Sequence, residues 1–341
     1  MSGDFNHSIL ESTAHRPWPM PRAAWLMTQS WHDLLFAHWR VDVSEVRRAV
    51  PTAFDLDLFD GEAWLGVVPF HMTNVGLRAL PAMPWISAFP ELNVRTYVRV
   101  ADRPGVYFFS LDAARWLAVA AARTLLNLPY YTADMTLERR GDGLGYESAR
   151  RTHQRAQFKA TYEPLGAPFA APVGSIEYFL TERYCLYQRD RRGRPYRLEI
   201  HHPPWSLQLA RATIATNTMA AASELTLNGA PALLHFARRQ DVVAWPPVRL
   251  AGRDPRACET SPSSATVPLV GCDVRKPVGI HRSSDRPIDG PAQARVSPTV
   301  EATSAPRVNG TAETSFDRPT RAKSRRPCRI EVRRDAGTCS P

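Results

Sequence analysis

The strand predicted over residues 91–98 carries side chains that could bind or transform a small polar molecule. Its polar residues alternate with apolar or small ones and therefore share one face: Glu91, Asn93, Arg95 and Tyr97. If this face lines a cavity, a carboxylate, an amide, a guanidinium and a phenol form a wall suited to a small ligand. If the face meets water, Glu91 and Arg95 form a surface ion pair worth about 0–1 kcal/mol. Periodicity alone leaves both interpretations open.

Two adjacent tyrosines, Tyr130 and Tyr131, follow a proline and precede a predicted strand. Neighbouring side chains of an extended chain point to opposite faces, so at most one of the two can line a given cavity. A tyrosine hydroxyl can donate to a carbonyl oxygen or act as a weak acid. Most buried tyrosines, however, pack and satisfy a single hydrogen bond. Arg183 is a further candidate, as a cation that could bind an anionic group.

Histidine and cysteine give weaker indications of a site. His201 and His202 are adjacent, and on a strand their rings point apart, which is not the spacing of a metal site. We therefore expect no metal and no cofactor, and we keep His201 only as a candidate for binding substrate. Cys185 lies among aromatic and apolar neighbours, which is typical of a packing residue rather than a nucleophile. The chain has no GxSxG, P-loop or GxGxxG motif.

The elements that must position these residues are mostly strands. Turn residues such as Asp60-Gly61 and Pro104-Gly105 separate short segments rich in β-branched and aromatic residues. Short helices are expected at 44–50, with Ser44 as the N-cap, and at 113–127, with Asp112 as the N-cap. Residues 74–90 are predicted to form a loop. This pattern predicts a mainly β (α+β) fold, an antiparallel barrel or sandwich with a few outer helices.

The composition changes sharply near residue 250. Of 32 aromatic residues, 31 precede that point, and only Phe316 follows it. Residues 251–341 cannot bury enough apolar surface to offset the entropy lost on ordering. We therefore predict three parts: a flexible N-terminal arm (1–24), one folded domain (25–250), and a disordered basic tail rich in proline, arginine and serine (251–341).

The formal net charge of +10 is weak support for nucleic-acid binding. The chain has 43 basic residues, of which only three are lysines, and this arginine bias with abundant alanine and proline is typical of a GC-rich genome. No zinc-finger, RNP or helix-turn-helix pattern is present, so nucleic acid is an unlikely partner, and the basic cluster at 321–329 is the main feature that favours one. The longest apolar run, 116–122, is far shorter than the roughly 20 residues of a membrane helix, so no membrane is expected.

Cysteine use and the N-terminus suggest a compartment. Only Cys185 lies in the predicted domain, and the first residues lack the apolar segment of a secretory signal. We expect a cytoplasmic protein whose partner is a small molecule, and a homo-oligomer is compatible with the sequence.

Five segments, taken in order, resemble the hallmark segments of the uncharacterised YqjF-like family: ELNVRTYV (91–98), GVYFFSLD (105–112), LPYYTADM (128–135), FLTERYCLY (179–187) and HHPPWSLQ (201–208). That family is similar to a branch of the acetoacetate decarboxylase-like superfamily. The resemblance covers roughly residues 28–250. It implies a closed, mainly antiparallel β-barrel with the site in its lumen, and so an inward-facing Glu91.

The resemblance also implies altered chemistry. Acetoacetate decarboxylase forms a Schiff base through a lysine of depressed pKa, and the counterpart of its lysine pair here is Tyr130-Tyr131. The glutamate of the decarboxylase is similar to Glu91. Tyrosine cannot form an imine, so the carboxylate is kept and the nucleophile is lost. Lys159, the one lysine of the predicted domain, lies on another strand, where we expect it to be solvated.

Three hypotheses follow. In the first, the barrel binds a small anionic or carbonyl-bearing molecule and is a lyase or isomerase without covalent catalysis. Arg95 and Arg183 hold the anion, Glu91 is the acid/base or the partner of Arg95, and Tyr130 or Tyr131 donates to a carbonyl or enolate oxygen. In the second, the same barrel binds a ligand without turnover. In the third, the protein is an interaction protein that uses its basic tail. The remaining candidates for substrate binding are Asn93, Tyr97 and His201.

Overall fold

Strands dominate the part of the chain that the structure describes, and all the strands within it join one 13-stranded sheet. The computed structural model describes residues 5–78, 88–114, 127–152 and 155–251. The predicted tail and most of the helix predicted at 113–127 lie outside the described residues. The strands are β1 (Met27–Val41), β2 (Asp55–Leu56), β3 (Ala63–Leu77), β4 (Phe89–Val100), β5 (Arg103–Ala113), β6 (Tyr130–Arg140), β7 (Gly143–Arg150), β8 (Gln157–Ala170), β9 (Cys185–Arg189), β10 (Pro195–His201), β11 (Ser206–Asn217), β12 (Leu233–Ala244) and β13 (Val248–Arg249).

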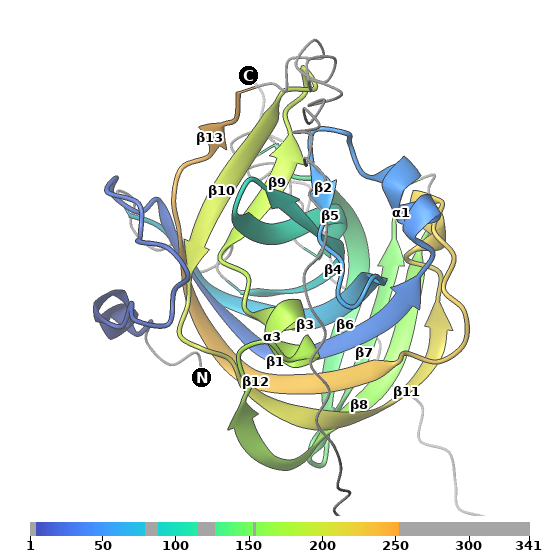
Figure 1. Ribbon diagram of the computed structural model, residues 1–341. Helices are drawn as coiled ribbons and strands as arrows, with labels where there is room; N and C mark the ends of the chain where they lie inside the picture. The colour runs from blue at the N-terminus through green and yellow to red at the C-terminus, as the bar shows by residue number, and fades with distance from the viewer. Residues whose placement is uncertain (1–4, 79–87, 115–126, 153–154, 252–341) are drawn as a thin grey trace, which may run out of the picture. The chain divides into compact units, whose positions relative to one another are not determined.

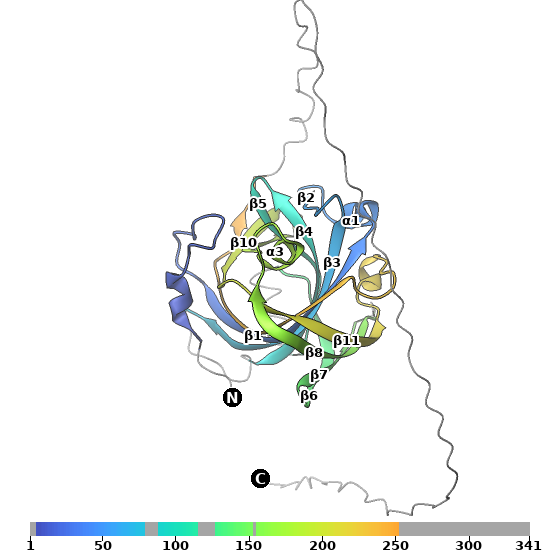
Figure 2. The same cartoon turned by 60° about the horizontal axis from the view of Figure 1, so that its bottom comes forward.

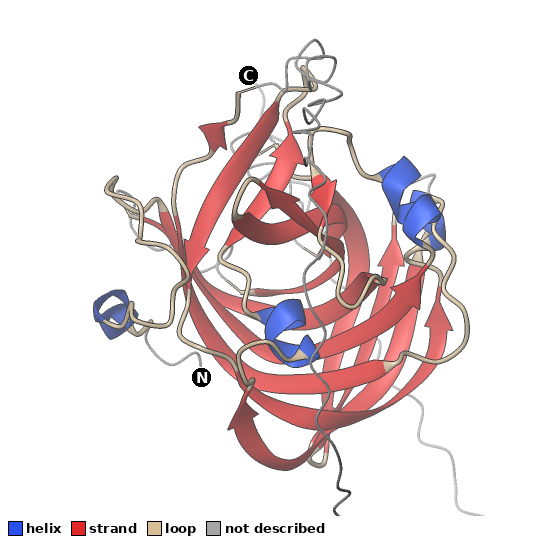
Figure 3. Cartoon of the chain, in the orientation of Figure 1, coloured by secondary structure: helices blue, strands red, loops and turns tan. Residues whose placement is uncertain are grey.

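The sheet returns on itself by two routes (Figures 1 and 3). Strands β12, β1, β3, β4 and β5 are common to both. One route leads from β5 back to β12 through β6, β7, β8 and β11, and the other through β9 and β10. The pairing is antiparallel except where β5 meets β6 and β9, which run parallel to it. We refer to this arrangement as the sheet ring.

Both faces of β4 are buried, each in its own hydrophobic cluster. Leu92, Val94 and Val98 pack in one cluster, and Tyr97 packs in the other. The predicted alternation along residues 91–98 is therefore present, and neither face of the segment meets water. Burial on both sides makes this strand a rigid support for the polar side chains that it carries.

The helices are short: α1 (Val43–Ala49), α3 (Ile176–Thr181) and the 3-10 helices η1 (His7–Glu11) and η2 (Ala221–Ser223). The prediction of Ser44 as an N-cap is wrong, because the N-cap lies two residues earlier, at Asp42. Asp42 caps α1, because its Oδ1 accepts hydrogen bonds from the backbone nitrogens of Ser44 (2.8 Å) and Glu45 (3.1 Å). A carboxylate accepts these bonds with a full charge, which also favours the positive end of the helix.

Three further local predictions are resolved by the structure. Asp60 and Gly61 both have positive φ (51° and 79°), as the tight turn between two strands requires. Both ends of the segment predicted to be a loop (74–90) are strand instead, because β3 continues to Leu77 and β4 begins at Phe89, and residues 79–87 lie outside the described ranges. Asp112 is not a helix cap: it lies in β5 with no exposed surface, paired with Arg150.

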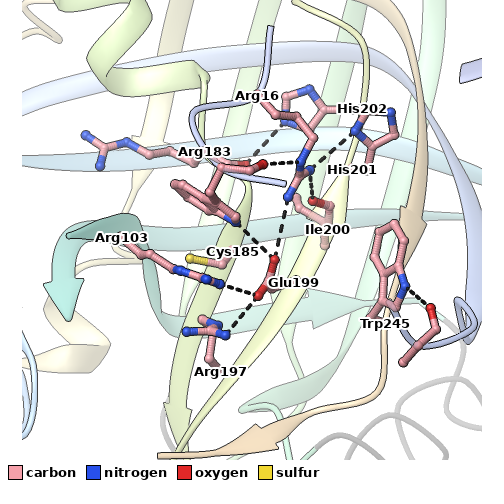
Figure 4. A network of polar contacts seen from close by, with 12 residues as sticks. Arg16, Arg103, Arg183, Cys185, Arg197, Glu199, Ile200, His201, His202 and Trp245 are labelled. Atoms are coloured by element: carbon pink, nitrogen blue, oxygen red, sulfur yellow. Dashed lines mark hydrogen bonds and ion pairs between the residues drawn. The ribbon is translucent and has the colours of Figure 1, made fainter. Parts of the chain in front are cut away.

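The N-terminal residues 5–24, predicted to be a flexible arm, pack against the outside of β10 instead (Figure 4). Glu199 holds them: its carboxylate accepts a hydrogen bond from Trp18 Nε1 (3.0 Å) and pairs with Arg16 Nη2 (3.6 Å). Two arginines of the sheet also form ion pairs with Glu199 Oε1: Arg103 at 2.7 Å and Arg197 at 2.9 Å. A single buried carboxylate thus joins the arm to β5 and β10.

None of the helices within the described ranges is long and apolar enough to cross a bilayer.

Figure 2 shows α3 over the opening of the sheet ring, between the strands that form its rim. Ser175 caps this helix through a hydrogen bond from Tyr178 N (3.2 Å), and Leu180 at its other end is fully buried. The C-terminal end of α3 is therefore part of the interior.

Candidate functional site

A cavity of about 90 Å³ lies among the strands of the shorter route around the sheet ring. Its wall is mainly apolar, with side chains such as Val68, Phe70, Leu111 and Leu128. Because about 10–15 Å³ of such volume is enough for one water molecule, the cavity has room for a small molecule. The polar residues that line it are Gln29, Glu91, Asn93, Arg95, Tyr130, Thr181, Arg183 and His202.

Glu91 and Tyr130 form a hydrogen-bonded pair at one side of this cavity. The Tyr130 hydroxyl donates to Glu91 Oε2 at 2.9 Å, and the two residues are only 7% and 2% exposed, respectively. The parallel pairing of β5 with β6 sets Tyr130 opposite Leu111, one strand away from β4, which brings its hydroxyl to the carboxyl group. Burial raises the pKa of Glu91 to about 8, although the Tyr130 hydrogen bond opposes the shift. The carboxyl group is therefore mostly protonated at neutral pH.

A buried ion pair supports this side of the cavity from behind. Arg150 Nη2 lies 2.8 Å from Asp112 Oδ1, and both side chains have essentially no exposed surface. Tyr131, the neighbour of Tyr130, packs against this guanidinium, whose central carbon lies 4.0 Å from the centre of the Tyr131 ring. Tyr131 does not line the cavity. The alternation of side chains thus separates the two tyrosines, and the charge on Asp112 adds to the rise in the pKa of Glu91.

Arg95 brings a positive charge to the cavity. It is 8% exposed, and no carboxylate pairs with it among the residues that the structure describes. Its Nη2 donates to the carbonyl oxygen of Leu180 (3.2 Å), at the end of α3. Its Nε and the Oδ1 of Asn93 are buried without a hydrogen-bond partner in the described part of the chain. Buried polar groups are normally paired, so these atoms are candidates for contacts with a ligand.

Tyr97 shares the strand face of Arg95 but does not line the cavity. Its hydroxyl donates to the Leu180 carbonyl (3.0 Å) and lies 2.7 Å from His38 Nε2. Arg95 and Tyr97 thus both bind the same carbonyl oxygen. This shared contact orients Arg95 relative to α3.

Arg183 lines the cavity as well, but its charge is already balanced. Its Nη1 is 2.5 Å from Asp57 Oδ2, and this carboxylate also pairs with Arg99 at 2.9 Å. Removing a buried cation from its carboxylate is costly, so Arg183 is less available than Arg95 to an anionic ligand.

The structure does not bring His201 to the cavity. His201 faces the N-terminal arm, where its Nε2 lies 2.7 Å from the carbonyl oxygen of Ile9. The next residue, His202, lines the cavity together with Trp205, whose Nε1 is buried without a partner among the described residues. Burial lowers the pKa of His202, so it is neutral at pH 7. Sequence alternation shows that the two histidines point apart, but it cannot tell which one points inward.

No lysine lines the described part of the cavity. Lys159 lies outside it on β8, where its Nζ pairs with Glu147 at 2.7 Å and its side chain is 59% exposed. Within the described ranges no group of three or more histidine, cysteine or acidic side chains is placed to hold a metal ion.

Comparisons with known proteins found a related sequence and several similar solved structures. The uncharacterized protein YqjF of Bacillus subtilis (strain 168) is 49% identical over 227 residues, which span 67% of this chain and 93% of that relative. Similar solved structures include the acetoacetate decarboxylase of Legionella pneumophila, with a TM-score of 0.48 at 13% identity over 74% of this chain and 99% of that one. An acetoacetate decarboxylase-like enzyme from Sphingomonas wittichii RW1 also gives a TM-score of 0.48 at 13% identity, over 71% and 99%.

The family profile of the uncharacterized conserved proteins called DUF2071 matches residues 28–241, which include all the described cavity-lining residues except Met27 and Ala244, just outside the two ends of the range. The resemblance to YqjF-like proteins is thereby confirmed. The chain belongs to the DUF2071 family.

Proposed function

We propose that the sheet ring is a closed barrel whose cavity binds a small molecule with a carboxylate or carbonyl group, and that the chain acts on it without a covalent intermediate. The observation that carries this proposal is Arg95, a buried guanidinium that faces the cavity and has no carboxylate partner among the described residues. A buried charge without a counter-ion is costly, and an anionic ligand removes that cost.

The charge balance of the cavity supports an anion. Glu91 is mostly neutral at pH 7 because burial raises its pKa to about 8, and His202 is neutral because burial lowers its pKa. Arg183 is balanced by Asp57. The cavity therefore has a net charge of about +1, which comes from Arg95.

Glu91 is the proposed acid/base. Its protonated carboxyl group can donate to a ligand oxygen, and its raised pKa suits proton transfer near neutral pH. Tyr130 holds the carboxyl group through the 2.9 Å hydrogen bond and can donate to a developing oxyanion in its place. Asn93, which lies between Glu91 and Arg95 on the same face of β4, can accept a hydrogen bond from the ligand at its Oδ1.

An imine mechanism has little support. The tyrosines at 130–131 cannot form one, and Lys159 lies on the exterior. We expect that borohydride reduction in the presence of acetoacetate, followed by mass spectrometry, gives no lysine adduct. An adduct on any lysine contradicts the non-covalent mechanism.

The binding proposal is tested by Arg95→Met. Short carboxylates such as acetate and butyrate should raise the melting temperature of the wild-type protein, whereas the matched neutral amides should not. Arg95→Met removes a buried, uncompensated charge, so the ligand-free variant should be at least as stable as the wild type and should show no shift with carboxylates.

The matched control for this test is Arg211→Met, which removes an exposed arginine that pairs with Glu163. This variant should keep the full carboxylate-induced shift. An equal shift in Arg95→Met and wild-type protein contradicts the proposed role of Arg95.

A non-catalytic ligand-binding protein is the second candidate, and it is favoured by the small number of reactive groups in the cavity. The two are distinguished by deuterium uptake from heavy water at the carbon next to the carbonyl of a bound oxo acid, followed by NMR. Uptake that depends on Glu91 supports the enzyme, and binding without uptake supports the binding protein.

A further inference from the structure

The turn of the β9–β10 hairpin carries a dense positive charge. Residues 185–201 contain five arginines and two carboxylates. Four arginines, three from the hairpin turn and one from β13, line a single open hollow of about 520 Å³ beside Tyr196: Arg191, Arg192, Arg194 and Arg249. Antiparallel pairing of Arg249 with Tyr196 brings the β13 arginine to the hairpin.

The carboxylates of this hairpin are already saturated. Asp190 accepts hydrogen bonds from the backbone nitrogens of Arg192 and Arg194, both at 2.9 Å, and from Arg194 Nε at 2.8 Å. These contacts hold the turn and lower the pKa of Asp190 to about 2. Asp190 also lines the hollow, but its carboxylate is engaged by Arg192 and Arg194 inside the turn, and no ion pair with Arg249 is present among the described residues.

Glu199, the second carboxylate, pairs with three arginines that do not line the hollow: Arg16 of the arm, Arg103 of β5 and Arg197 of β10 (Figure 4). It therefore cannot balance the hollow. Arg192 and Arg249 are exposed, and no ion pair of either side chain is present among the described residues. These two guanidinium groups therefore bring positive charge to the hollow that no carboxylate of the described residues balances.

We propose that this hollow, named the hairpin hollow, binds closely spaced phosphate groups. A guanidinium presents a planar fork of donors that matches phosphate oxygens in pairs, and several forks around one concave surface suit a ligand with several adjacent phosphates. The volume of about 520 Å³ is within the range of ligand sites. This inference is independent of the cavity, and its success or failure leaves the proposed function unaffected.

The test is isothermal titration of the full chain with inorganic tripolyphosphate at low ionic strength. Wild-type protein should bind it, and Arg192→Gln/Arg249→Gln should weaken binding at least about tenfold, because two of the charged donors to the phosphate oxygens are lost. Both side chains are exposed, so the melting temperature of the double variant should equal that of the wild type.

The matched control is Arg140→Gln/Arg211→Gln, which removes two exposed arginines that pair with surface carboxylates elsewhere on the sheet. It should bind tripolyphosphate like the wild type. No binding by the wild type, or equal losses in the two double variants, overturns the proposal.

Two further probes distinguish the source of the phosphates. A short oligouridylate that binds more tightly than tripolyphosphate, and loses its affinity in Arg192→Gln/Arg249→Gln, assigns the hollow to a nucleic-acid backbone. Weaker binding of the oligouridylate assigns it to a free polyphosphate. A hexaglutamate peptide that binds more tightly than both overturns the choice of phosphate.

Discussion

At the residue scale, the protonation state of one carboxyl group governs the cavity. Glu91 is 2% exposed, and burial raises its pKa to about 8. In the unfolded chain the same group titrates near 4.5. Between these two values the folded protein holds a proton that the unfolded chain has released, so the contribution of Glu91 to stability falls as the pH rises.

Glu91→Gln tests this pKa through stability. Glutamine keeps the shape and stays neutral, so between pH 5 and 7 the variant should gain on the wild type by roughly 1.4 kcal/mol of unfolding free energy for each unit of pH. Denaturant unfolding at several pH values measures the difference. The control is Glu147→Gln, which alters an exposed carboxylate beside Lys159. A difference between Glu91→Gln and wild type that stays constant with pH contradicts the raised pKa.

At the element scale, β10 has two faces with different tasks. Leu198 and Ile200 line the cavity, while Glu199 and His201 face the N-terminal arm. Arg16 of the arm also donates to the carbonyl oxygen of Ile200 at 2.8 Å. The arm thus stabilises, from the outer face, a strand that forms part of the cavity wall. Nothing in the local sequence of the arm predicts an ordered element.

Glu199→Gln tests whether this carboxylate holds the N-terminal arm against β10. The substitution leaves Arg16, whose side chain has no exposed surface, without its counter-charge, and we expect a loss of about 3 kcal/mol of unfolding free energy. Hydrogen exchange in residues 5–24 should increase. Glu163→Gln, at an exposed pair with Arg211, should change neither quantity appreciably. Unchanged exchange in residues 5–24 contradicts the role of Glu199.

At the scale of the whole molecule, the described fold and its cavity lie within residues 5–251. The first compact unit of the chain ends at Ala265. Every buried core residue and every cavity-lining residue described here belongs to that unit.

A chain shortened to residues 1–265 should therefore fold and keep the properties of the cavity. Its melting temperature and its carboxylate-induced shift should match those of the full chain, as measured side by side by thermal unfolding. Loss of the shift on shortening, with folding retained, contradicts a cavity built from the first unit alone.

The sequence by itself determined the class of fold and the strand segments, because these depend on local patterns. Period-2 alternation placed Glu91, Asn93 and Arg95 on one face. The turn at Asp60-Gly61 was predicted correctly, whereas Pro104-Gly105, also predicted to be a turn, lies inside β5, and the chain turns at residues 101–102 instead. The family segments gave the correct family.

Only the tertiary structure decided which of these residues meet. Parallel pairing of β5 with β6 selects Tyr130 over Tyr131, and the path of β10 selects His202 over His201. Asp57, 126 residues away along the chain, balances Arg183, while no described carboxylate pairs with Arg95. Strand register, counter-ion choice and the docking of residues 5–24 all depend on contacts between distant segments, and a local pattern carries no information about them.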